Sequence, residues 1–331
     1  MTDTGKKEPV LRIRDLSVSF ATDEGNVKAV QRVSLDLFPG ETLGLVGESG
    51  CGKSVTAMSC LRLIPSPPGR IEAGQALFRG RDLLRIPAAD LRRVRGNAVG
   101  MIFQEPMTAL SPLHRVGKQL AEGIRLHRDV PRTEAWRTGE EWLRKVGIPD
   151  PGKCMYGYPH QLSGGMRQRV MIAMALMLSP EIVIADEPTT ALDVTIQAQV
   201  LDIIRGMIEK RTSLLLITHD MGVIWEMCSR VAVMYSSEIV EEGPIADVFE
   251  TPLHPYTEAL LESVPSLQER RGRLATIKGQ VPSPLHFVRG CRFRDRCKYA
   301  FERCGAEHPP LYGVRGRLSR CFLREHEDDA R

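Results

Sequence analysis

The hydrophobic and polar residues of this chain follow two patterns that predict strands. In residues 11–20 and 33–37, apolar and polar positions alternate, which is typical of strands with one buried face. Elsewhere, apolar residues form short unbroken runs, which predict strands buried on both faces. These runs occupy residues 43–46, 99–103, 182–185 and 214–217. A further strand pair is expected near residues 71–78.

Segments with helical character lie between these runs. Helices are expected at residues 53–63, 166–178 and 194–210, and residues 88–177 are mainly helical in pattern. Unbroken strands that alternate with helices indicate a parallel sheet covered on both faces. The sequence therefore predicts an α/β fold with a mostly parallel sheet, an antiparallel β part near the N-terminus and a helical subdomain at about 105–175.

Length and composition predict more than one domain. The chain has 331 residues, of which 42% are apolar and 26% charged, so it is long enough for two domains and too apolar for general disorder. Beyond residue 260 the proline and cysteine content indicates a small, loop-rich extension. We expect a main domain over residues 1–260 and an extension over residues 261–331.

Charge and apolar run length argue against two classes of protein. Basic residues exceed acidic ones by four within residues 289–331, and the rest of the chain is formally neutral. A neutral body lacks the broad basic face of a nucleic-acid-binding protein, so no nucleic acid partner is expected. The longest clean apolar run, residues 170–178, is far shorter than the roughly 18 residues of a membrane-spanning helix. The N-terminus is polar, so we expect a soluble, cytoplasmic chain.

A glycine-rich motif follows the run at 43–46 and precedes a predicted helix. It fits the pattern G-x-x-x-x-G-K-[ST] and consists of Gly47, Glu48, Ser49, Gly50, Cys51, Gly52, Lys53 and Ser54. Its glycines let backbone N–H groups point at phosphate oxygens, and the helix N-terminus adds positive charge. Lys53 would contact the β- and γ-phosphates of ATP, and the Ser54 hydroxyl would ligate Mg²⁺. Cys51 is expected to fill space in this loop, and the helix N-terminus could lower its thiol pKa.

Two acids follow the apolar run at 182–185. Asp186, at the end of a buried strand, is suited to hold Mg²⁺. Glu187 is suited to act as the general base for a water that attacks the γ-phosphate. The pair therefore extends the predicted nucleotide site from binding to hydrolysis.

A second glycine motif distinguishes the chain from other nucleotide-hydrolysing proteins. It consists of Leu162, Ser163, Gly164, Gly165 and Met166. It resembles the LSGGQ-like signature of the ATP-binding subunits of ABC transporters, with Met166 where many relatives have Gln. The resemblance covers roughly residues 10–260 and implies the ABC-type P-loop ATPase fold.

This resemblance implies roles for individual residues. Phe20 would stack on the adenine, although a core position is the alternative for this side chain. Gln104 would contact Mg²⁺ or the attacking water, His219 would bind the γ-phosphate, and Asp193 would cross a dimer interface. In the family, the signature of one subunit caps the γ-phosphate bound to the other. A chain with one copy of each motif must therefore pair, and a similar but non-identical chain is expected as its partner.

Four cysteines lie in the basic C-terminal segment, at Cys291, Cys297, Cys304 and Cys321. Their spacing lacks the close pairs of zinc sites, and disulfides are unusual in the cytosol. A [4Fe–4S] cluster on four thiolates is negatively charged, which the interleaved basic residues would offset. Zinc, and a metal-free basic patch for RNA or lipid headgroups, remain as alternatives. Together with residues 254–257 and 279–284, the segment resembles the C-terminal extension of oligopeptide/dipeptide importers, some of which carry such a cluster.

The resemblance implies an ATPase that drives import of di- or oligopeptides. It would lie peripherally on the cytoplasmic face of the cell membrane, with two separate membrane permease subunits and an extracytoplasmic substrate-binding protein. Import of nickel or another small solute by the same machinery is an alternative. A soluble ABC ATPase that acts on nucleic acid or ribosomes is a second alternative, which the neutral body disfavours.

Overall fold

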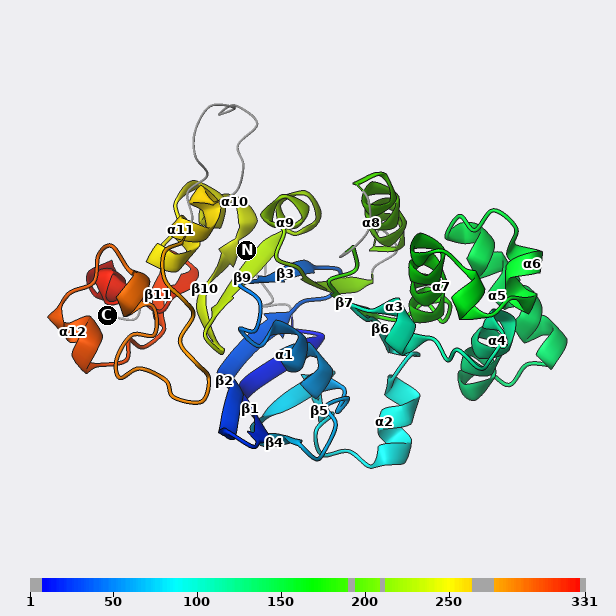
Figure 1. Ribbon diagram of the computed structural model, residues 1–331, viewed down its shortest axis with the longest axis horizontal. Coiled ribbons are helices and arrows are strands. Elements are labelled where there is room, and N and C mark those ends of the chain that lie inside the picture. The colour runs from blue at the N-terminus through cyan, green and yellow to red at the C-terminus, as the bar shows by residue number, and fades with distance from the viewer. Residues whose placement is uncertain (1–7, 190–193, 209–211, 264–276, 328–331) are drawn as a thin grey trace, which may run out of the picture. The chain divides into compact units, whose positions relative to one another are not determined.

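The computed structural model describes residues 8–189, 194–208, 212–263 and 277–327 (Figure 1). Contacts between Cα atoms divide them into two compact units. The first unit contains residues 8–10, Leu37–Glu41 and the described residues of Arg85–Ile217; the second contains Leu11–Asp36, Thr42–Leu84 and the described residues from Thr218 onward. Each unit is therefore built from segments that are far apart in the sequence.

The first unit contains three parallel strands, β6 (Val99–Ile102), β7 (Ile182–Asp186) and β8 (Ser213–Ile217). Strand β7 lies between the other two, with Ile182 opposite both Val99 of β6 and Ser213 of β8. Every residue of β7 and β8 is buried, which explains why they appear in the sequence as unbroken apolar runs. The predicted parallel pairing is confirmed for these strands.

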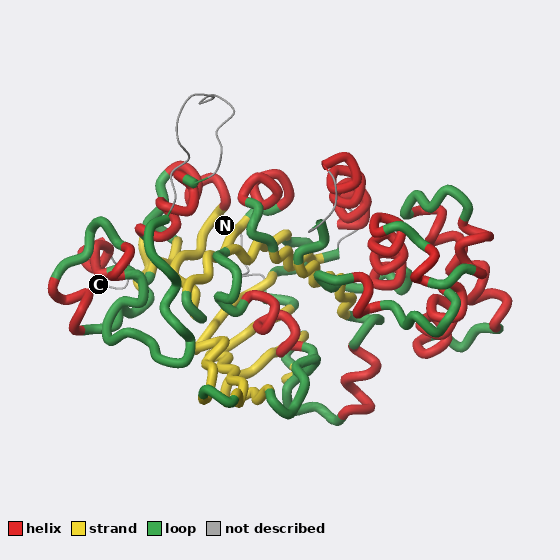
Figure 2. Tube along the Cα trace, in the orientation of Figure 1, coloured by secondary structure: helices red, strands yellow, loops and turns green. Residues whose placement is uncertain are grey.

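Most of the first unit's helices lie between β6 and β7 in the sequence. They are α3 (Pro106–Ala109), α4 (Val116–His127), α5 (Arg132–Lys145), α6 (Pro151–Tyr156) and α7 (Gly164–Leu176), while α2 (Ala88–Val94) precedes β6 and α8 (Val194–Ile208) precedes β8. Figure 2 draws residues 106–176 as helix and loop only. Helix α7 packs directly on β6, because a Cβ added to Gly100 would lie 2.4 Å from the carbonyl oxygen of Ala175.

An antiparallel sheet opens the second unit. Its strand order is β2-β1-β4-β5, with β1 (Leu11–Thr22), β2 (Gly25–Leu37), β4 (Gly69–Phe78) and β5 (Arg81–Asp82). In β1 and β4 the register runs from Leu11 opposite Phe78 to Phe20 opposite Gly69. The alternating pattern of the N-terminal residues is therefore that of a sheet with one buried face, as expected.

The second unit also contains a mixed set of strands in the order β3-β9-β10-β12-β11. Their bounds are β3 (Thr42–Val46), β9 (Arg230–Tyr235), β10 (Glu238–Pro244), β11 (Tyr312–Val314) and β12 (Arg317–Ser319). Strands β3 and β9 are parallel, and β12 pairs antiparallel with β10. The C-terminal extension therefore supplies two strands to this sheet, whereas the sequence indicated a loop-rich segment.

Short helices complete the second unit. They are α1 (Lys53–Cys60), α9 (Met221–Met227), α10 (Ile245–Glu250), α11 (Pro255–Glu262) and α12 (Glu302–Ala306). Helix α1 begins at the expected residue and ends three residues earlier than the predicted helix. In the part of the chain that the structure describes, no helix is both long enough and apolar enough to span a membrane.

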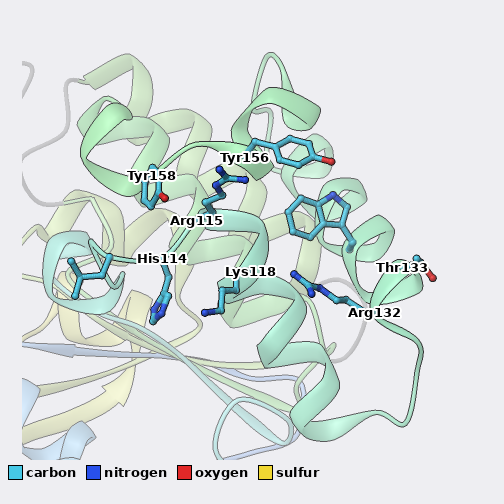
Figure 3. Close-up of a pocket in the computed structure, with 9 residues that line it drawn as sticks. His114, Arg115, Lys118, Arg132, Thr133, Tyr156 and Tyr158 are labelled. Atoms are coloured by element: carbon cyan, nitrogen blue, oxygen red, sulfur yellow. The ribbon is translucent and has the colours of Figure 1, made fainter.

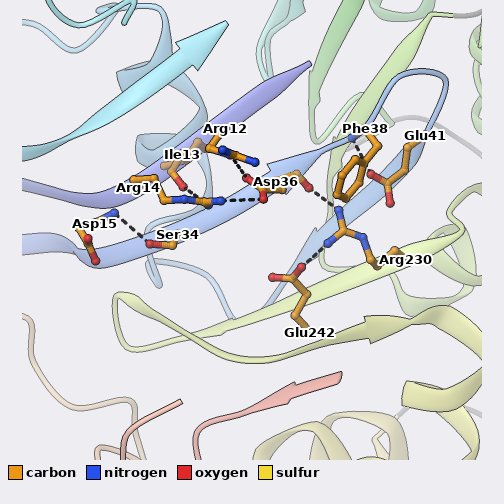
Figure 4. A network of polar contacts seen from close by, with 10 residues as sticks. All are labelled: Arg12, Ile13, Arg14, Asp15, Ser34, Asp36, Phe38, Glu41, Arg230 and Glu242. Atoms are coloured by element: carbon orange, nitrogen blue, oxygen red, sulfur yellow. Dashed lines mark hydrogen bonds and ion pairs between the residues drawn. The ribbon is translucent and has the colours of Figure 1, made fainter. Parts of the chain in front are cut away.

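A polar network around Asp36 joins several strands of the second unit (Figure 4). The Asp36 carboxylate lies 3.3 Å from Arg12 Nε and 2.7 Å from Arg14 Nη2, both on β1. The guanidinium of Arg230, on β9, donates to the Asp36 carbonyl oxygen and pairs with the Glu242 carboxylate. These contacts link the antiparallel sheet to β9 and β10.

Candidate functional site

The phosphate loop lies in the second unit, between β3 and α1, and its glycines adopt conformations that other residues rarely take. The φ angles of Gly47, Gly50 and Gly52 are 150°, 78° and 105°. A Cβ on Gly47 would lie 2.0 Å from the Met234 carbonyl oxygen, and one on Gly52 would lie 2.2 Å from the Ala29 carbonyl oxygen. The loop therefore needs glycine for its backbone angles at all three positions and also for close packing at two of them.

Lys53 lies at the base of this loop, at the first residue of α1. Its ammonium donates to the carbonyl oxygens of Gly47 at 2.7 Å and Glu48 at 3.1 Å, and the residue is 5% exposed. No side chain caps the N-terminus of α1, and a helix N-terminus favours a bound anion. The half-buried Ser54 follows at the second helical position. This arrangement is suited to bind phosphate oxygens.

Cys51 is buried beneath the loop, where it fills space as expected. The residue is 1% exposed, and its Sγ would lie 2.9 Å from a Cβ on Gly47. Burial raises the pKa of the Cys51 thiol, although Lys53 Nζ lies 3.8 Å from the sulfur. The suggested lowering of this pKa by the helix N-terminus is therefore wrong, because desolvation of the thiolate outweighs the nearby positive charge.

Two further predicted contacts of ATP also lie in the second unit. Phe20 is half-buried near the end of β1, and its Cε1 would lie 3.0 Å from a Cβ on Gly69 of β4. His219 is exposed and lies just before α9. The N-terminus of α9 is capped by Asp220, which accepts the N–H groups of the second and third helical residues at 2.8 and 3.3 Å.

The first unit brings together two predicted catalytic side chains. Gln104 Nε2 lies 3.2 Å from Glu187 Oε2, across the carboxyl ends of β6 and β7. The Glu187 backbone has φ 45°, a strained value for a residue with a side chain, and its N–H donates to the Ile217 carbonyl oxygen at 2.8 Å. Asp186, the last residue of β7, is 3% exposed. Carboxylate and amide oxygens at this edge form a donor set that Mg²⁺ prefers.

The signature motif forms the start of α7. Ser163 is the N-cap residue, and its hydroxyl accepts the Met166 N–H at 3.3 Å. Leu162 is buried, whereas Ser163 and Gly164 are exposed and Gly165 is half-buried. Seven residues of α7 are buried, Val170, Ile172 and Ala173 among them, and they fix the helix. The motif therefore faces solvent on a rigid support, and Asp193 lies outside the described residues.

Gln168, which the sequence analysis did not single out, connects the signature helix to the catalytic strand. The residue is 3% exposed, and its Nε2 donates to the Pro188 carbonyl oxygen at 2.5 Å. Pro188 directly follows Glu187, so Gln168 helps to hold the turn that carries the predicted base. The available signal was an amide side chain among the buried, otherwise apolar positions of α7.

The four C-terminal cysteines line one small cavity of about 20 Å³, which has room for one water-sized particle. Burial raises the pKa of Cys291 to about 12 and that of Cys321 to about 11. The four thiols that could ligate a cluster therefore surround a single cavity. Within the described ranges, however, no three His, Cys, Asp or Glu side chains are arranged as ligands of a metal ion.

The basic residues between these cysteines are paired with carboxylates of the protein. Ion pairs join Arg296 to Glu48, Lys298 to Glu258, Arg303 to Glu325, and both Arg292 and Arg320 to the buried Glu238. Most of their charges are therefore compensated within the protein, although Arg292 and Arg320 share one carboxylate. The local excess of basic residues does not by itself indicate a negatively charged cluster.

His254, the N-cap residue of α11, gives the fold a pH dependence. It is 2% exposed, its Nδ1 accepts the Tyr256 N–H at 3.0 Å, and burial lowers its pKa to about 3. An unfolded histidine titrates near pH 6.5. Between these values the unfolded chain binds the extra proton, so this contribution to stability is complete above pH 6.5 and is lost as the pH falls.

We therefore expect His254→Asn, which keeps a capping acceptor without the proton, to weaken this acid sensitivity. From pH 7 to pH 5, the free energy of unfolding of the wild type should fall by about 2 kcal/mol more than that of the variant, at about 1.4 kcal/mol per pH unit for one proton. Denaturant unfolding at both pH values measures the difference. His286→Asn, at an exposed position, is the control, and parallel pH profiles for wild type and His254→Asn would contradict the prediction.

The helical part of the first unit contains a separate cavity of about 660 Å³ (Figure 3). None of its lining residues is acidic, and three of them, Arg115, Lys118 and Arg132, are positively charged. The other lining residues are Leu113, His114, Thr133, Trp136, Tyr156 and Tyr158. The rings of Trp136 and Tyr156 lie 5.1 Å apart. Two lining residues expose much apolar surface, Leu113 at 82% and Tyr156 at 61%. The cavity is therefore suited to a partner with acidic and apolar side chains.

The strand order, the phosphate loop and the acids at the strand ends define a P-loop nucleotide-binding protein. Residues 30–190 match the model of the family described as ABC transporter, and residues 240–304 match that described as oligopeptide/dipeptide transporter, C-terminal region. A Sinorhizobium fredii protein named as a probable peptide ABC transporter ATP-binding protein is 48% identical over 97% of each chain. A Brucella melitensis protein, named for peptide import and ATP binding, is 48% identical over 96% of this chain and 97% of its own.

Solved structures agree with this assignment at the level of fold. The dimeric structure of a bacterial ABC transporter cassette matches 71% of this chain and 98% of its own, with a TM-score of 0.64 and 24% identity. An ABC transporter component from Clostridium perfringens matches with a TM-score of 0.60. The chain belongs to the ATP-binding proteins of the ABC transporter family, and it is an ATPase.

Proposed function

We propose that this ATPase drives the import of di- or oligopeptides. The observation that carries the proposal is the match of residues 240–304 to the oligopeptide/dipeptide transporter C-terminal region, next to an ATPase core. Relatives that are 48% identical and named for peptide transport support it. We further propose the division into an ATPase domain of residues 1–260, with its helical subdomain at about 105–175, and an extension of residues 261–331.

In this proposal, the phosphate loop binds the phosphates of ATP, and residues at the strand ends activate the attacking water. The N–H groups of Gly50–Ser54 and the Lys53 ammonium bind the β- and γ-phosphates. Ser54, Gln104 and Asp186 would hold Mg²⁺, which would neutralise charge on the phosphates. Glu187 accepts a proton from the attacking water, Gln104 orients that water, and His219 donates a hydrogen bond to the γ-phosphate. Phe20 stacks on the adenine.

Each chain supplies half of two sites in this proposal. Ser163, Gly164 and Gly165 present a hydroxyl and N–H groups at the exposed start of α7, where they can bind the γ-phosphate held by another subunit. Asp193 would contact that subunit. We propose a non-identical ATP-binding chain as the partner, so that hydrolysis separates two unlike subunits.

We propose that the cavity in the helical part receives a cytoplasmic segment of a membrane permease. Charge complementarity supports this, since Arg115, Lys118 and Arg132 line the cavity without an acid, beside exposed apolar side chains. Two permease subunits would hold the ATPase on the cytoplasmic face of the membrane. An extracytoplasmic binding protein would deliver the peptide.

Reversal of one charge in the cavity tests this docking site. We expect Lys118→Glu to weaken co-purification with the permease about tenfold, because it opposes the acids of the partner, without loss of the isolated chain's ATPase activity. Lys153→Glu on α6 is the control, as an exposed lysine outside the cavity lining. Equal permease binding by both variants would place the interface elsewhere.

We propose a [4Fe–4S] cluster on Cys291, Cys297, Cys304 and Cys321, supported by the cavity that all four line. The thiols must move apart to admit a cluster, since the cavity holds only about one water-sized particle. Iron and acid-labile sulfide are expected in protein purified without oxygen, at four atoms of each per chain. Stoichiometric zinc in place of iron would assign a different metal to the site. If the protein contains neither iron nor zinc, the four cysteines are free thiols and the proposal fails.

Reconstitution of the complex tests the main proposal. The chain is expected to co-purify in mild detergent with two permease subunits and a second ATP-binding chain. Its ATPase rate should rise when the binding protein is loaded with peptide. Stimulation by nickel-loaded and not by peptide-loaded protein would favour metal import, and stimulation by RNA or ribosomes alone would contradict a transport function.

A further inference from the structure

The phosphate loop makes two polar contacts with the chain that follows β10. The N–H of Glu48, the second residue of the loop motif, donates to the Tyr256 hydroxyl at 2.9 Å. The Glu48 carboxylate lies 3.0 Å from Arg296 Nη1. Tyr256 is the second residue of α11, and Arg296 directly precedes Cys297, so both contacts come from the region that matches the transporter C-terminal model. This C-terminal region therefore holds both the backbone and the side chain of Glu48.

Arg296 is fixed by more than its ion pair. Its side chain is 5% exposed, and Nη1 also lies 3.3 Å from the Tyr235 hydroxyl. Its Nε and Nη2 donate to the carbonyl oxygens of Lys278 and Ile277, at 3.0 and 3.3 Å. All three guanidinium nitrogens are therefore engaged. A lysine in its place could keep the charge but could not reproduce this planar set of bonds.

An aromatic cluster supports this arrangement. The ring of Tyr235 lies 4.5 Å from that of Tyr256 and 5.2 Å from that of Phe293. Both tyrosines are fully buried, and Phe293 is 2% exposed. Because Phe293 lies two residues after Cys291, the cluster joins the cysteine segment to β9, the strand whose Met234 carbonyl packs on Gly47. The position of the Arg296 guanidinium is therefore set by a rigid surrounding.

We propose that Arg296 is a positioning residue for ATP binding. It holds Glu48, and with Tyr256 it keeps the phosphate loop in the conformation that accepts the phosphates of ATP. The conformation of the four-cysteine segment is thereby coupled to nucleotide affinity. This inference rests on the ATP-binding function, and it adds to that function a dependence on the C-terminal extension.

The first test compares ATP affinity in matched variants of the full chain. Arg296→Gln is expected to weaken ATP binding about tenfold, the effect of about one charged hydrogen bond. Arg303→Gln is the control, because Arg303 lies in the same segment and pairs with Glu307 and Glu325. Glu48→Gln should weaken binding similarly, and Arg296→Gln should add little in that background, since both changes remove the same contact.

The second test needs no nucleotide. Cys51 is buried beneath the phosphate loop, so its alkylation by iodoacetamide reports opening of the loop. We expect Arg296→Gln to raise this rate about tenfold and Arg303→Gln to leave it unchanged. Mass spectrometry of the peptide that contains Cys51 separates this thiol from the others. Thermal unfolding without ATP shows whether the two arginine variants are equally folded.

The outcomes separate this inference from the proposed function. Wild-type protein that binds no ATP would overturn the function, whereas normal wild-type binding with an unchanged Arg296→Gln would overturn only the role of Arg296. Equal losses in Arg296→Gln and Arg303→Gln would also overturn it, because the effect would then belong to the extension as a whole. If Arg296→Gln does not fold, Arg296→Lys and Tyr256→Phe carry the same comparison, since each keeps the side-chain volume and removes part of the contact.

Discussion

Replacement of Glu187 by Gln is expected to stop ATP hydrolysis while ATP remains bound. The amide keeps the size of the side chain and can still contact Gln104, which lies 3.2 Å from Glu187 in the wild type, but it cannot accept a proton from water. Loss of a general base lowers a rate by about 10²- to 10⁴-fold. Single-turnover hydrolysis measures the chemical step, and light scattering with ATP measures the stable pairing that should accompany bound nucleotide.

The matched control for this change is Glu105→Gln. Glu105 is exposed and adjacent to Gln104 in the sequence, so the variant removes one negative charge near the same strand end. We expect it to hydrolyse ATP within a few-fold of the wild type. If Glu187→Gln retained a similar turnover, the base would have to be another group, and the strained backbone at Glu187 would lose its functional explanation.

Replacement of Gly47 by Ala is expected to abolish ATP binding and to destabilise the second unit. The new Cβ would lie 2.0 Å from the Met234 carbonyl oxygen, at a φ of 150°. The loop or β9 must move to relieve this contact, at a cost of about 3 kcal/mol. We expect at least a 100-fold loss of ATP affinity, measured by calorimetry, and a lower midpoint of thermal unfolding.

Gly40→Ala separates the steric contact from the backbone angle. Gly40 also has a positive φ, 71°, but an added Cβ there would meet nothing within 4 Å. That variant should lose about 1 kcal/mol of stability and keep its ATP affinity. Should Gly47→Ala bind ATP as well as Gly40→Ala does, the close packing of the loop would not be required for binding.

The structural elements that were predicted correctly from the sequence are those that local patterns determine. The unbroken runs became the buried strands β6, β7 and β8, because a strand buried on both faces leaves no place for polar residues. The phosphate loop begins and ends where its glycines require positive φ angles, and Ser163 caps α7 as a residue of its type does. The contact between Gln104 and Glu187 is different, because it depends on the pairing of β6 with β7, whose ends these two residues follow.

The expectations that failed depended on neighbours that are distant in sequence. The pKa of the Cys51 thiol is raised by burial, not lowered by its position before a helix, and the loop that contains it packs on the distant Met234. The basic residues among the cysteines were expected to balance a cluster, and the sequence did not show that distant carboxylates such as Glu48 and Glu325 pair with them. Strands β11 and β12 are three residues each, too short to show an alternating pattern.

The sequence by itself determined the class of chemistry, because an anion-binding loop, a signature helix and acids at strand ends each need particular residues at fixed spacing. Only the tertiary structure decided how the C-terminal extension relates to that chemistry. Arg296 and Tyr256 lie more than 200 positions from Glu48, and nothing in their local patterns marks them as contacts of the phosphate loop. Contacts across such distances depend on the packing of the whole unit, which local sequence patterns do not encode.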